Sequence, residues 1–451
     1  MAQCKEKFKR FKQKGQEAWK DISLITYVLV VLFGIGAWVA INGLWVEMPV
    51  MVQEIPESWS LPSYLTVIIQ IGNIGPLAFT ILNLYHPKKI NEVSVTYVLI
   101  IIGISSCSLL ALFWKETVYI AGAERSIALL ILSFFLSTVD CTSSVAFVPY
   151  MARFREVYLS PYFVGEGLSG LIPSLVALAQ GVGEGASHEK CATPLTMNTS
   201  NATNSTSQSW GPGPRFSTDV FFWFLTGMMA LCWIAFLGLN TLPVIQKEKV
   251  RNNSMHSSMS DVYELQTIDN IEGKQKQFIN NPVIKQSMRT NVFLLILLAV
   301  INGLSNGIIP AIQSFACIPY SYYIYLLTLT LSNIANPLTC LIFPMIRTKS
   351  VPVLTVLSVI YCTMCVYILV IASQSPYVLL KCHDAGAVLI VLISVSAVAV
   401  VSYCKITISA LMRDQGRKHL LWFGISTQVG SCIGALSIFA PVNVYKVFKQ
   451  A

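Results

Sequence analysis

Charged residues are scarce in this chain of 451 residues, since Asp, Glu, Lys and Arg together make up 12%, against about 25% in an average soluble domain. Hydrophobic residues make up 54% and the net charge is +9. This composition disfavours a water-soluble globule, a disordered chain, and a collagen or coiled coil, which would need a short repeat. No dense basic stripe lies outside the ends of the apolar segments, which disfavours a nucleic-acid-binding protein. A polytopic membrane protein remains.

The sequence also lacks the motifs of common enzymes and metal sites. It contains no zinc-protease motif and no P-loop. The twelve cysteines lie mostly inside apolar runs and do not form a disulfide scaffold. The five histidines all fall in loops or at the ends of apolar segments: His86, His188, His256, His383 and His419. We therefore expect no enzyme, no bound metal and no cofactor.

Eleven apolar segments are each long enough to cross a membrane. A spanning helix needs about 20 mostly apolar residues, and a backbone in lipid must satisfy its own hydrogen bonds, which favours helices over strands. The segments lie near 24–46, 61–85, 93–114, 126–150, 161–183, 218–242, 291–311, 320–346, 351–373, 385–404 and 420–441. The predicted fold class is an all-α polytopic membrane protein with about eleven transmembrane helices.

The basic residues predict how the chain lies in the membrane. If the N-terminus is cytoplasmic, 24 Lys and Arg residues fall in cytoplasmic segments and seven in extracellular ones, and cytoplasmic loops are those that hold the excess. An odd number of spans then leaves the C-terminus outside. The predicted organisation is a basic cytoplasmic arm over 1–23, a six-helix bundle over 24–242, a disordered cytoplasmic linker over 243–290, a five-helix bundle over 291–441 and an extracellular tail over 442–451.

The extracellular loop over 184–217 has two features of a secreted environment. Three glycosylation sequons follow one another in it, at Asn198, Asn201 and Asn204. The only two cysteines in extracellular segments are Cys191 and Cys382. An oxidising compartment permits a disulfide between them, and the sequence leaves open whether they come close enough to form one.

An internal repeat relates the two predicted bundles. The segment Ile41–Leu44 recurs as Ile301–Leu304, and Asn73–Leu77 recurs as Asn333–Leu338, both at an offset of 260 residues. Six spans separate the partners, so they run in the same direction, as in the two halves of major-facilitator transporters. We predict a 6+5 pseudo-symmetric arrangement, major-facilitator-like or equilibrative-nucleoside-transporter-like. Transport is favoured by analogy, and the alternative is a shared packing unit without transport.

Polar residues at corresponding positions of the two halves predict a wet cavity between them. In the first span Trp38, Asn42 and Trp45 share one helical face, and amides in lipid turn toward other helices or water. Helix–helix packing is the alternative for each. Pro49, Pro76, Pro310 and Pro337 are expected to break these helices. We expect the substrate to contact Trp38, Asn42, Trp45, Glu47, Tyr64, Gln70, Asn73, Asn302, Asn306, Ser332, Asn336 and Gln428.

Charge inside the spans is sparse and includes Asp140 and Glu166, with Glu47 and Lys405 at the edges. A strongly charged substrate would need paired counter-charges, so the lining suits a neutral, planar, hydrogen-bonding molecule. Aromatic faces supply stacking and amides supply donors and acceptors, which fits a nucleobase-like ring or a flavin-like ring with a polyol. Asp140 and Glu166 are candidate proton sensors, and a structural hydrogen bond is the alternative for Asp140.

Several long motifs resemble the vertebrate riboflavin transporters of solute carrier family 52. They are Ile41–Val50, Trp59–Gln70, Asn73–Leu77, Asp140–Val145, Gly165–Gly181 and Gln428–Leu436. The resemblance implies eleven spans and facilitated, sodium-independent uptake of riboflavin across the plasma membrane, favoured at acidic pH. We expect a monomer whose partners are riboflavin and the lipid bilayer. A nucleoside or nucleobase carrier and a non-transporting receptor are the alternatives.

For a riboflavin carrier working by alternating access, each candidate residue has an expected role. Trp38 and Trp45 would sandwich or edge the isoalloxazine ring, and Glu47 would shape the outer gate. Hydrogen bonds to the pyrimidine edge and the ribityl hydroxyls would come from Asn42, Gln70, Asn73, Asn302 and Asn336.

Overall fold

The computed structural model describes residues 23–85, 91–120, 122–151, 153–181, 214–246, 248–249, 287–342, 350–381, 383–415 and 417–449. Several sequence predictions fall outside these residues. They concern the basic arm before Ser23, the sequons at Asn198, Asn201 and Asn204, the cysteines Cys191 and Cys382, and most of the linker over 243–290.

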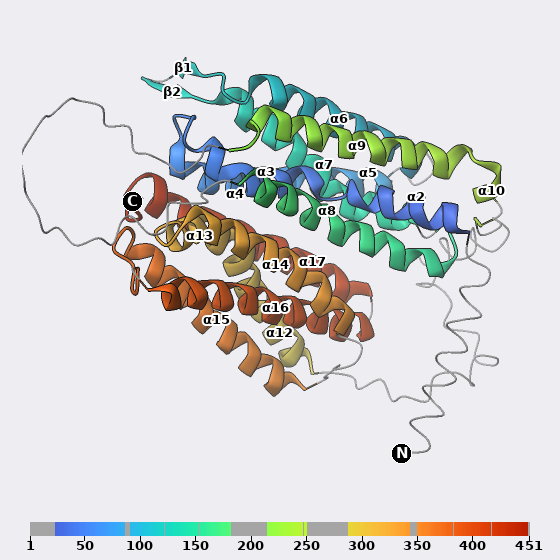
Figure 1. Ribbon diagram of the computed structural model, residues 1–451. Helices are drawn as coiled ribbons and strands as arrows, with labels where there is room; N and C mark the ends of the chain where they lie inside the picture. Colours follow the sequence, from blue (N-terminus) through green and yellow to red (C-terminus); the bar gives the residue numbers. More distant parts are fainter. Residues whose placement is uncertain are drawn as a thin grey trace, which may run out of the picture.

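Two groups of helices build the molecule, one above the other in Figure 1. The N-terminal bundle contains α2 (Leu24–Ile35), α3 (Val39–Met51), η1 (Ser58–Ser60), α4 (Leu61–Gly72), α5 (Ile74–Tyr85), α6 (Glu92–Phe113), α7 (Ile127–Met151), η2 (Glu156–Tyr158), α8 (Leu159–Gln180), α9 (Thr218–Thr241) and α10 (Pro243–Gln246). The C-terminal bundle contains α12 (Met288–Asn302), η4 (Gly303–Ile308), α13 (Ile309–Cys317), α14 (Tyr322–Ile342), α15 (Val351–Ser373), α16 (Asp384–Asp414) and α17 (Arg417–Asn443).

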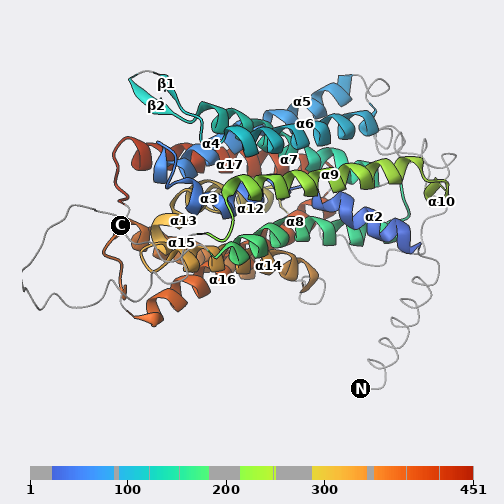
Figure 2. The same ribbon diagram turned by 45° about the horizontal axis from the view of Figure 1, so that its top comes forward.

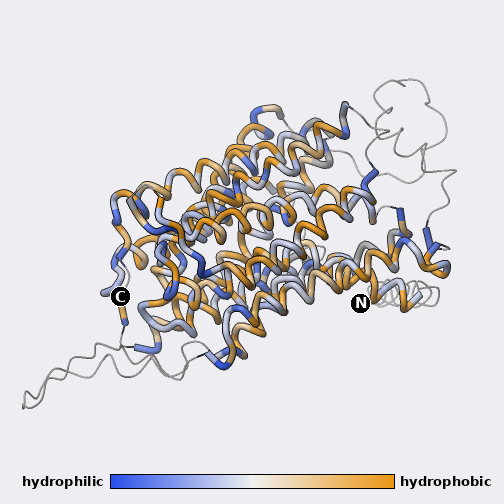
Figure 3. Tube along the Cα trace, turned by 90° about the horizontal axis from the view of Figure 1, so that it is seen from above, coloured by the Kyte–Doolittle hydropathy of each residue, from blue (hydrophilic) through white to orange (hydrophobic). Residues whose placement is uncertain are grey.

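Apolar composition explains why these segments are helices that face lipid. Nine helices of the described residues are long and apolar enough to cross a membrane, and the bent pair α2–α3 makes ten. Helix α14 has 21 residues, close to the spanning length, but polar residues such as Thr328 and Asn333 lower its hydropathy. Hydrophobic residues follow the helices and hydrophilic residues gather at their ends (Figure 3). The all-α prediction holds for the spans.

The two ends of the molecule differ in their loops. The end with the two-stranded hairpin β1 (Val118–Ile120) and β2 (Ala123–Arg125), which sequence reasoning did not predict, is called the hairpin end. Gly122 has a φ of +82° there, a conformation that favours glycine. The opposite end, with α10, is called the α10 end. Its loops contain the ion pairs of Arg153 with Glu92 and of Arg155 with Glu248.

Lys249 lies at the α10 end, outside the spans. Its ammonium lies over the ring of Phe154, 5.6 Å from the centroid. Burial lowers the pKa of Lys249 below its usual value, and the positive charge of Arg153 lowers it further.

The packing of helices repeats between the two bundles. Helix α2 packs on α8 as α12 packs on α17, and α4 packs on α7 as α14 packs on α16. Glycines make the first of these contacts close in both bundles. A Cβ on Gly165 would lie 2.1 Å from the Val31 carbonyl oxygen, and one on Gly430 would lie 2.1 Å from the Ala299 carbonyl oxygen. Small residues at such crossings let backbones approach and gain packing energy in lipid.

The bundles meet along two equivalent seams. Helix α8 packs on α14, and α4 packs on α17, as Figure 2 also shows. These are the fifth span against the eighth, and the second against the eleventh. In the 260-residue repeat, the fifth span corresponds to the eleventh and the second span corresponds to the eighth. One seam is therefore the image of the other under the pseudo-twofold axis that the repeat predicts.

Only two of the four prolines expected to break helices lie beside a break. The second span is interrupted at Asn73, just before Pro76, and α13 begins with Pro310 in its first turn. Pro49 and Pro337 lie inside the continuous helices α3 and α14, so the prediction for these two is wrong. The first span bends instead by 52° between Ile35 and Val39. A single missing amide is tolerated when another group bonds the freed carbonyl.

Candidate substrate site between the two bundles

One face of the first span is accessible while the rest is buried. Between Gly34 and Val52 every residue is buried except Trp38, Asn42 and Trp45, which are half-buried. The other sides of α3 are covered by α7, α8 and α9. The accessible face therefore points toward the C-terminal bundle, whose α14 it also contacts. These are the three residues that helical spacing placed together.

Asn42 lies in a polar cluster that joins the two bundles. Its Nδ2 donates to Ser169 Oγ at 3.5 Å, and the Nδ2 of Asn333 in α14 donates to Ser174 Oγ at 2.9 Å and to the Gly170 carbonyl at 3.3 Å. A Cβ on Gly170 would lie 3.3 Å from Asn42 Nδ2 and 3.2 Å from Asn333 Cγ. Glycine thus lets both amides approach α8 closely.

A second polar cluster lies around η4 in the C-terminal bundle. The Nδ2 of Asn306 donates to Asn302 Oδ1 at 3.3 Å and to Ser431 Oγ at 3.1 Å. Lys405 Nζ donates to Ser305 Oγ at 2.7 Å and to Asn306 Oδ1 at 3.2 Å. Asn302 is buried, whereas Asn306 is exposed although it lies in the middle of a span.

The segment Gly303–Ile308 is a π-helix, and this changes the symmetry of the site. Its i→i+5 hydrogen bonds admit an extra residue per turn. Asn302, the counterpart of Asn42, is buried just before this turn, and Asn306, within it, takes the accessible place. The spacing correctly predicts that Asn302 and Asn306 lie together, but it gives no signal for the π-turn.

The remaining predicted contacts of the second, eighth and eleventh spans are accessible to different degrees. Asn73 Nδ2 donates to Gln70 Oε1 at 3.3 Å at the break between α4 and α5, where both side chains are half-buried. Asn336 is exposed, and its Oδ1 accepts from Ser402 Oγ at 2.8 Å. Ser332 is half-buried and Gln428 is exposed.

Interactions between the bundles close the hairpin end. Asn443 Nδ2 donates to Ser63 Oγ at 2.6 Å. The rings of Tyr64 and Phe439 meet edge to face at 5.4 Å, and those of Trp59 and Tyr322 lie 6.1 Å apart. Tyr64 therefore lies at the closure and also accepts from Arg125 Nη1 at 3.4 Å.

The carbonyl of Trp45 takes part in the same closure. Pro49 has no amide proton, which leaves the carbonyl four residues earlier without its helical partner. The hydroxyl of Tyr325, in the other bundle, donates to this carbonyl at 3.5 Å. The proline that does not break α3 thus provides an acceptor for a bond between the bundles.

Glu47 lies within the N-terminal bundle, fully buried, and does not line the space between the bundles. Its Oε1 accepts from Gln180 Nε2 at 3.0 Å and from Thr218 Oγ1 at 2.7 Å. The carboxyl group thus links α3 to α8 and to the start of α9. Glu47 lies on the face of α3 opposite Trp45, so it is not on the face where the sequence predicts contact with the substrate.

Asp140 and Glu166 occupy different surroundings. Asp140 is fully buried, and its Oδ2 accepts from the Ile41 backbone amide at 3.0 Å, where α3 begins. Ser143 Oγ, one turn later on α7, donates to the Ala37 carbonyl at 2.9 Å. Both side chains thus bond backbone groups at the bend of the first span. Glu166 is half-buried on α8, the helix that faces α14.

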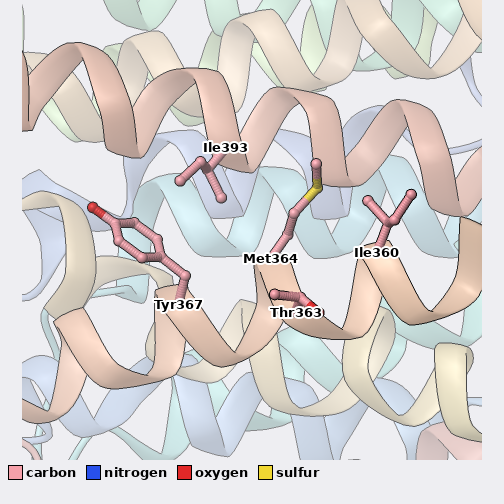
Figure 4. A pocket seen from close by; sticks show the side chains of 5 residues that line it. All are labelled: Ile360, Thr363, Met364, Tyr367 and Ile393. Carbon is pink, nitrogen blue, oxygen red and sulfur yellow. The ribbon is translucent and has the colours of Figure 1, made fainter.

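A separate hollow of about 430 Å³ lies on the C-terminal bundle between α15 and α16. Figure 4 shows its lining side chains, which are Ile360, Thr363, Met364, Tyr367 and Ile393. Helix α15 packs on α12, α13 and α16 of its own bundle. The lining is nearly all apolar and includes no residue of the two polar clusters, so this hollow is not the candidate site.

Sequence reasoning missed four residues that the structure adds to the candidate site: Ser169, Ser174, Ser305 and Asn333. Asn333 had a signal, because it is the repeat partner of Asn73. Lys405 was noted as a charge at the edge of a span but not assigned to the site. Together the two clusters and the accessible face of the first span offer amides, hydroxyls, one ammonium and two indole rings, which can bind a planar molecule without a net charge.

Comparison with solved structures identifies the fold. A mutant of the nucleoside transporter NupG is similar with a TM-score of 0.55 at 12% identity, over 93% of this chain and 91% of that chain. A D-xylose–proton symporter is similar with a TM-score of 0.55 at 14% identity, over 94% and 90%. The chain therefore has the fold of major-facilitator transporters, as the repeat predicted.

Comparison of sequences identifies the family. The chain is 42% identical to riboflavin transporter member 3-B of Danio rerio over 448 residues, which cover 95% of this chain and 98% of that protein. It is 40% identical to riboflavin transporter 2 of Salmo salar and 37% identical to human member 3, again over 95% of this chain and 98% of each relative. The family model "Solute carrier family 52, riboflavin transporter" matches residues 22–450. The chain belongs to solute carrier family 52.

Proposed function

We propose that this chain transports riboflavin across a membrane by alternating access. The observation that supports this most is the accessible face of Trp38, Asn42 and Trp45 on a span that is otherwise buried and that faces the other bundle. Two indole rings separated by an amide suit a flat, neutral ring with hydrogen-bonding edges. The relatives named riboflavin transporters supply the identity of the ring. Being named as transporters, they also favour a carrier over an enzyme.

The ligand would lie between the two polar clusters. The indoles of Trp38 and Trp45 stack on the isoalloxazine ring, and the amides of Asn42 and Asn333 bond its edge or the ribityl chain. The side chains that complete the lining are Gln70, Asn73, Asn302, Asn306, Ser332, Asn336 and Gln428. Glu47 holds α3 in place from within the N-terminal bundle, and Tyr64 belongs to the closure at the hairpin end.

The conformation fits one half of a transport cycle. The bundles touch at the hairpin end through Ser63 and Asn443. In the second span, α4 at the hairpin end packs on α17, whereas α5, toward the α10 end, packs mainly on α7, and Ile74, Leu77 and Trp422 are more than half exposed. With a cytoplasmic N-terminus the site would open to the cytoplasm. Rocking of the bundles about their two seams would open it to the outside.

The proposal includes the cellular setting. The protein would lie in the plasma membrane as a monomer and take up riboflavin without sodium, faster at acidic external pH. The loop over 184–217 would carry glycans at its three sequons, and Cys191 and Cys382 would be joined there in the oxidising exterior.

Uptake into proteoliposomes tests the function. We expect purified protein to accumulate labelled riboflavin, with competition by lumiflavin, no competition by uridine and no change when choline replaces sodium. Competition by uridine equal to that by lumiflavin would identify a nucleoside carrier instead. Saturable binding of riboflavin without accumulation would identify a receptor. A Trp38→Ala/Asn42→Ala double variant is the site control, and Trp223→Ala, on α9, is its matched variant outside the site.

A further inference from the structure

Lys405 is a positive charge inside a membrane span and forms no ion pair with the residues that the structure describes. It lies within the part of α16 that is long and apolar enough to cross the membrane, Asp384–Met412, where a charged side chain is costly and rare. In the part of the chain that the structure describes, the ion pairs join other residues: Lys115–Glu54, Arg153–Glu92 and Arg155–Glu248. Such a residue in a span is commonly functional.

Two neutral oxygens hold the ammonium in place. Ser305 Oγ lies 2.7 Å and Asn306 Oδ1 lies 3.2 Å from Nζ. The amide nitrogen of Asn306 donates to Asn302 and Ser431, which fixes its oxygen toward Lys405. An ammonium has three donors, so one N–H remains after these two bonds. The group is thus oriented but keeps a donor for an acceptor from outside the protein.

A chain of contacts places Lys405 on the side of the C-terminal bundle that faces the N-terminal bundle. Asn333 on α14 bonds Ser174 on α8. One turn later on α14, Asn336 accepts from Ser402 of α16, and Ser402 lies one turn before Lys405. Lys405 therefore borders the same space as Asn336 and Asn306, which are both exposed.

The chemistry of this group selects its ligand atoms. A hydrogen bond from an ammonium is charge-assisted, and it is stronger than a neutral bond when the acceptor concentrates negative charge. Conjugated carbonyl oxygens of a planar heterocycle concentrate it more than the hydroxyls of a polyol do. The π-turn of η4 that presents Ser305 and Asn306 is a feature frequent at functional sites.

We propose that Lys405, oriented by Ser305 and Asn306, is a subsite that donates to the carbonyl oxygens at the pyrimidine edge of the transported ring. The proposal rests on the proposed riboflavin transport and deepens it, because it assigns the C-terminal bundle to the carbonyl edge. The N-terminal bundle then supplies the stacking surface of Trp38 and Trp45. Lys405 would discriminate among rings by their carbonyl groups.

Analogues altered at the carbonyl edge test the subsite. In wild-type protein, replacing a ring carbonyl oxygen by sulfur (2-thioriboflavin or 4-thioriboflavin) should weaken competition, because sulfur is a poorer acceptor. Lys405→Met should raise the KM of riboflavin by about 10-fold or more, as the loss of a charge-assisted bond implies. The same variant should make riboflavin and its weaker thio analogue equal competitors.

Lumiflavin, which has the ring without the ribityl chain, should lose affinity for Lys405→Met by the same factor. Lys115→Met is the matched control, because Lys115 pairs with Glu54 at the hairpin end.

The outcomes separate the two proposals. An unchanged KM, a preserved preference for oxygen over sulfur, or an unchanged affinity for lumiflavin in Lys405→Met would each overturn the subsite. Absence of riboflavin uptake by wild-type protein would instead overturn the proposed function. If Lys405→Met does not reach the membrane, Ser305→Ala keeps the charge and loosens its position. That variant should reduce the oxygen-over-sulfur preference by about threefold, as the loss of one neutral hydrogen bond implies, and an unchanged preference would overturn the proposal.

Discussion

At the scale of the residue, Trp45 has two separate roles, one for its backbone carbonyl and one for its side chain. Its carbonyl accepts from Tyr325 because Pro49 cannot donate to it, while its half-buried indole faces the other bundle. We expect Trp45→Ala to raise the KM of riboflavin about 2- to 12-fold, the range that an aromatic pair worth about 0.5–1.5 kcal/mol implies. Trp45→Phe should restore most of the affinity. The concentration dependence of uptake measures both.

Trp223 provides the comparison for Trp45. It is 49% exposed on α9, a helix that packs on α2, α3 and α6 of its own bundle. Trp223→Ala should leave the KM unchanged. Equal effects of the two alanine variants would mean that Trp45 acts through general packing rather than through the ligand.

At the scale of the element, the sequence predicted the faces of helices better than their bends. Helical spacing grouped Trp38, Asn42 and Trp45 correctly, because a side chain's face depends only on local periodicity. The bend of the first span lies between Ile35 and Val39 rather than at Pro49. It depends on Asp140 and Ser143, about 100 residues away, which bond the backbone there. Such long-range bonds leave no local pattern in the sequence.

Asp140 caps α3 from another helix, which leads to a prediction for this element. The N-cap residue of α3, Trp38, makes no side-chain cap, and Asp140 accepts from the Ile41 amide in its place. Asp140→Ala leaves that buried amide without a partner and should cost about 1–3 kcal/mol of stability. Asp140→Asn keeps an acceptor oxygen and should lose less. Thermal unfolding of the purified variants in detergent measures the order.

The same variants separate this cap from proton sensing. If Asp140 serves as a cap, Asp140→Asn retains the pH dependence of uptake shown by wild-type protein. A flat pH profile in Asp140→Asn, with normal thermal stability, would assign the residue to proton sensing instead.

At the scale of the whole molecule, the repeat predicted the two bundles and their common direction, since matching motifs recur at one offset. The repeat could not predict which end of the space between the bundles is closed in this conformation. The seams α4–α17 and α8–α14 are equivalent by symmetry, so tilting toward either end satisfies the repeat equally. The closure at the hairpin end depends on particular side chains such as Tyr64, Phe439 and Asn443, whose pairing across 380 residues no local signal reveals.

That closure gives the last prediction, which concerns the movement of one bundle against the other. Ser63 Oγ and Asn443 Nδ2 lie 2.6 Å apart across the bundles. We expect a Ser63→Cys/Asn443→Cys protein to be joined by a short thiol-reactive cross-linker and to lose riboflavin uptake, because the hairpin end can no longer open. A cleavable cross-linker should restore uptake on reduction. The matched control is Glu54→Cys/Lys115→Cys, whose parent side chains pair within the N-terminal bundle at the same end. Cross-linking that pair should leave uptake intact, and full uptake by completely cross-linked Ser63→Cys/Asn443→Cys protein would rule out alternating access through this end.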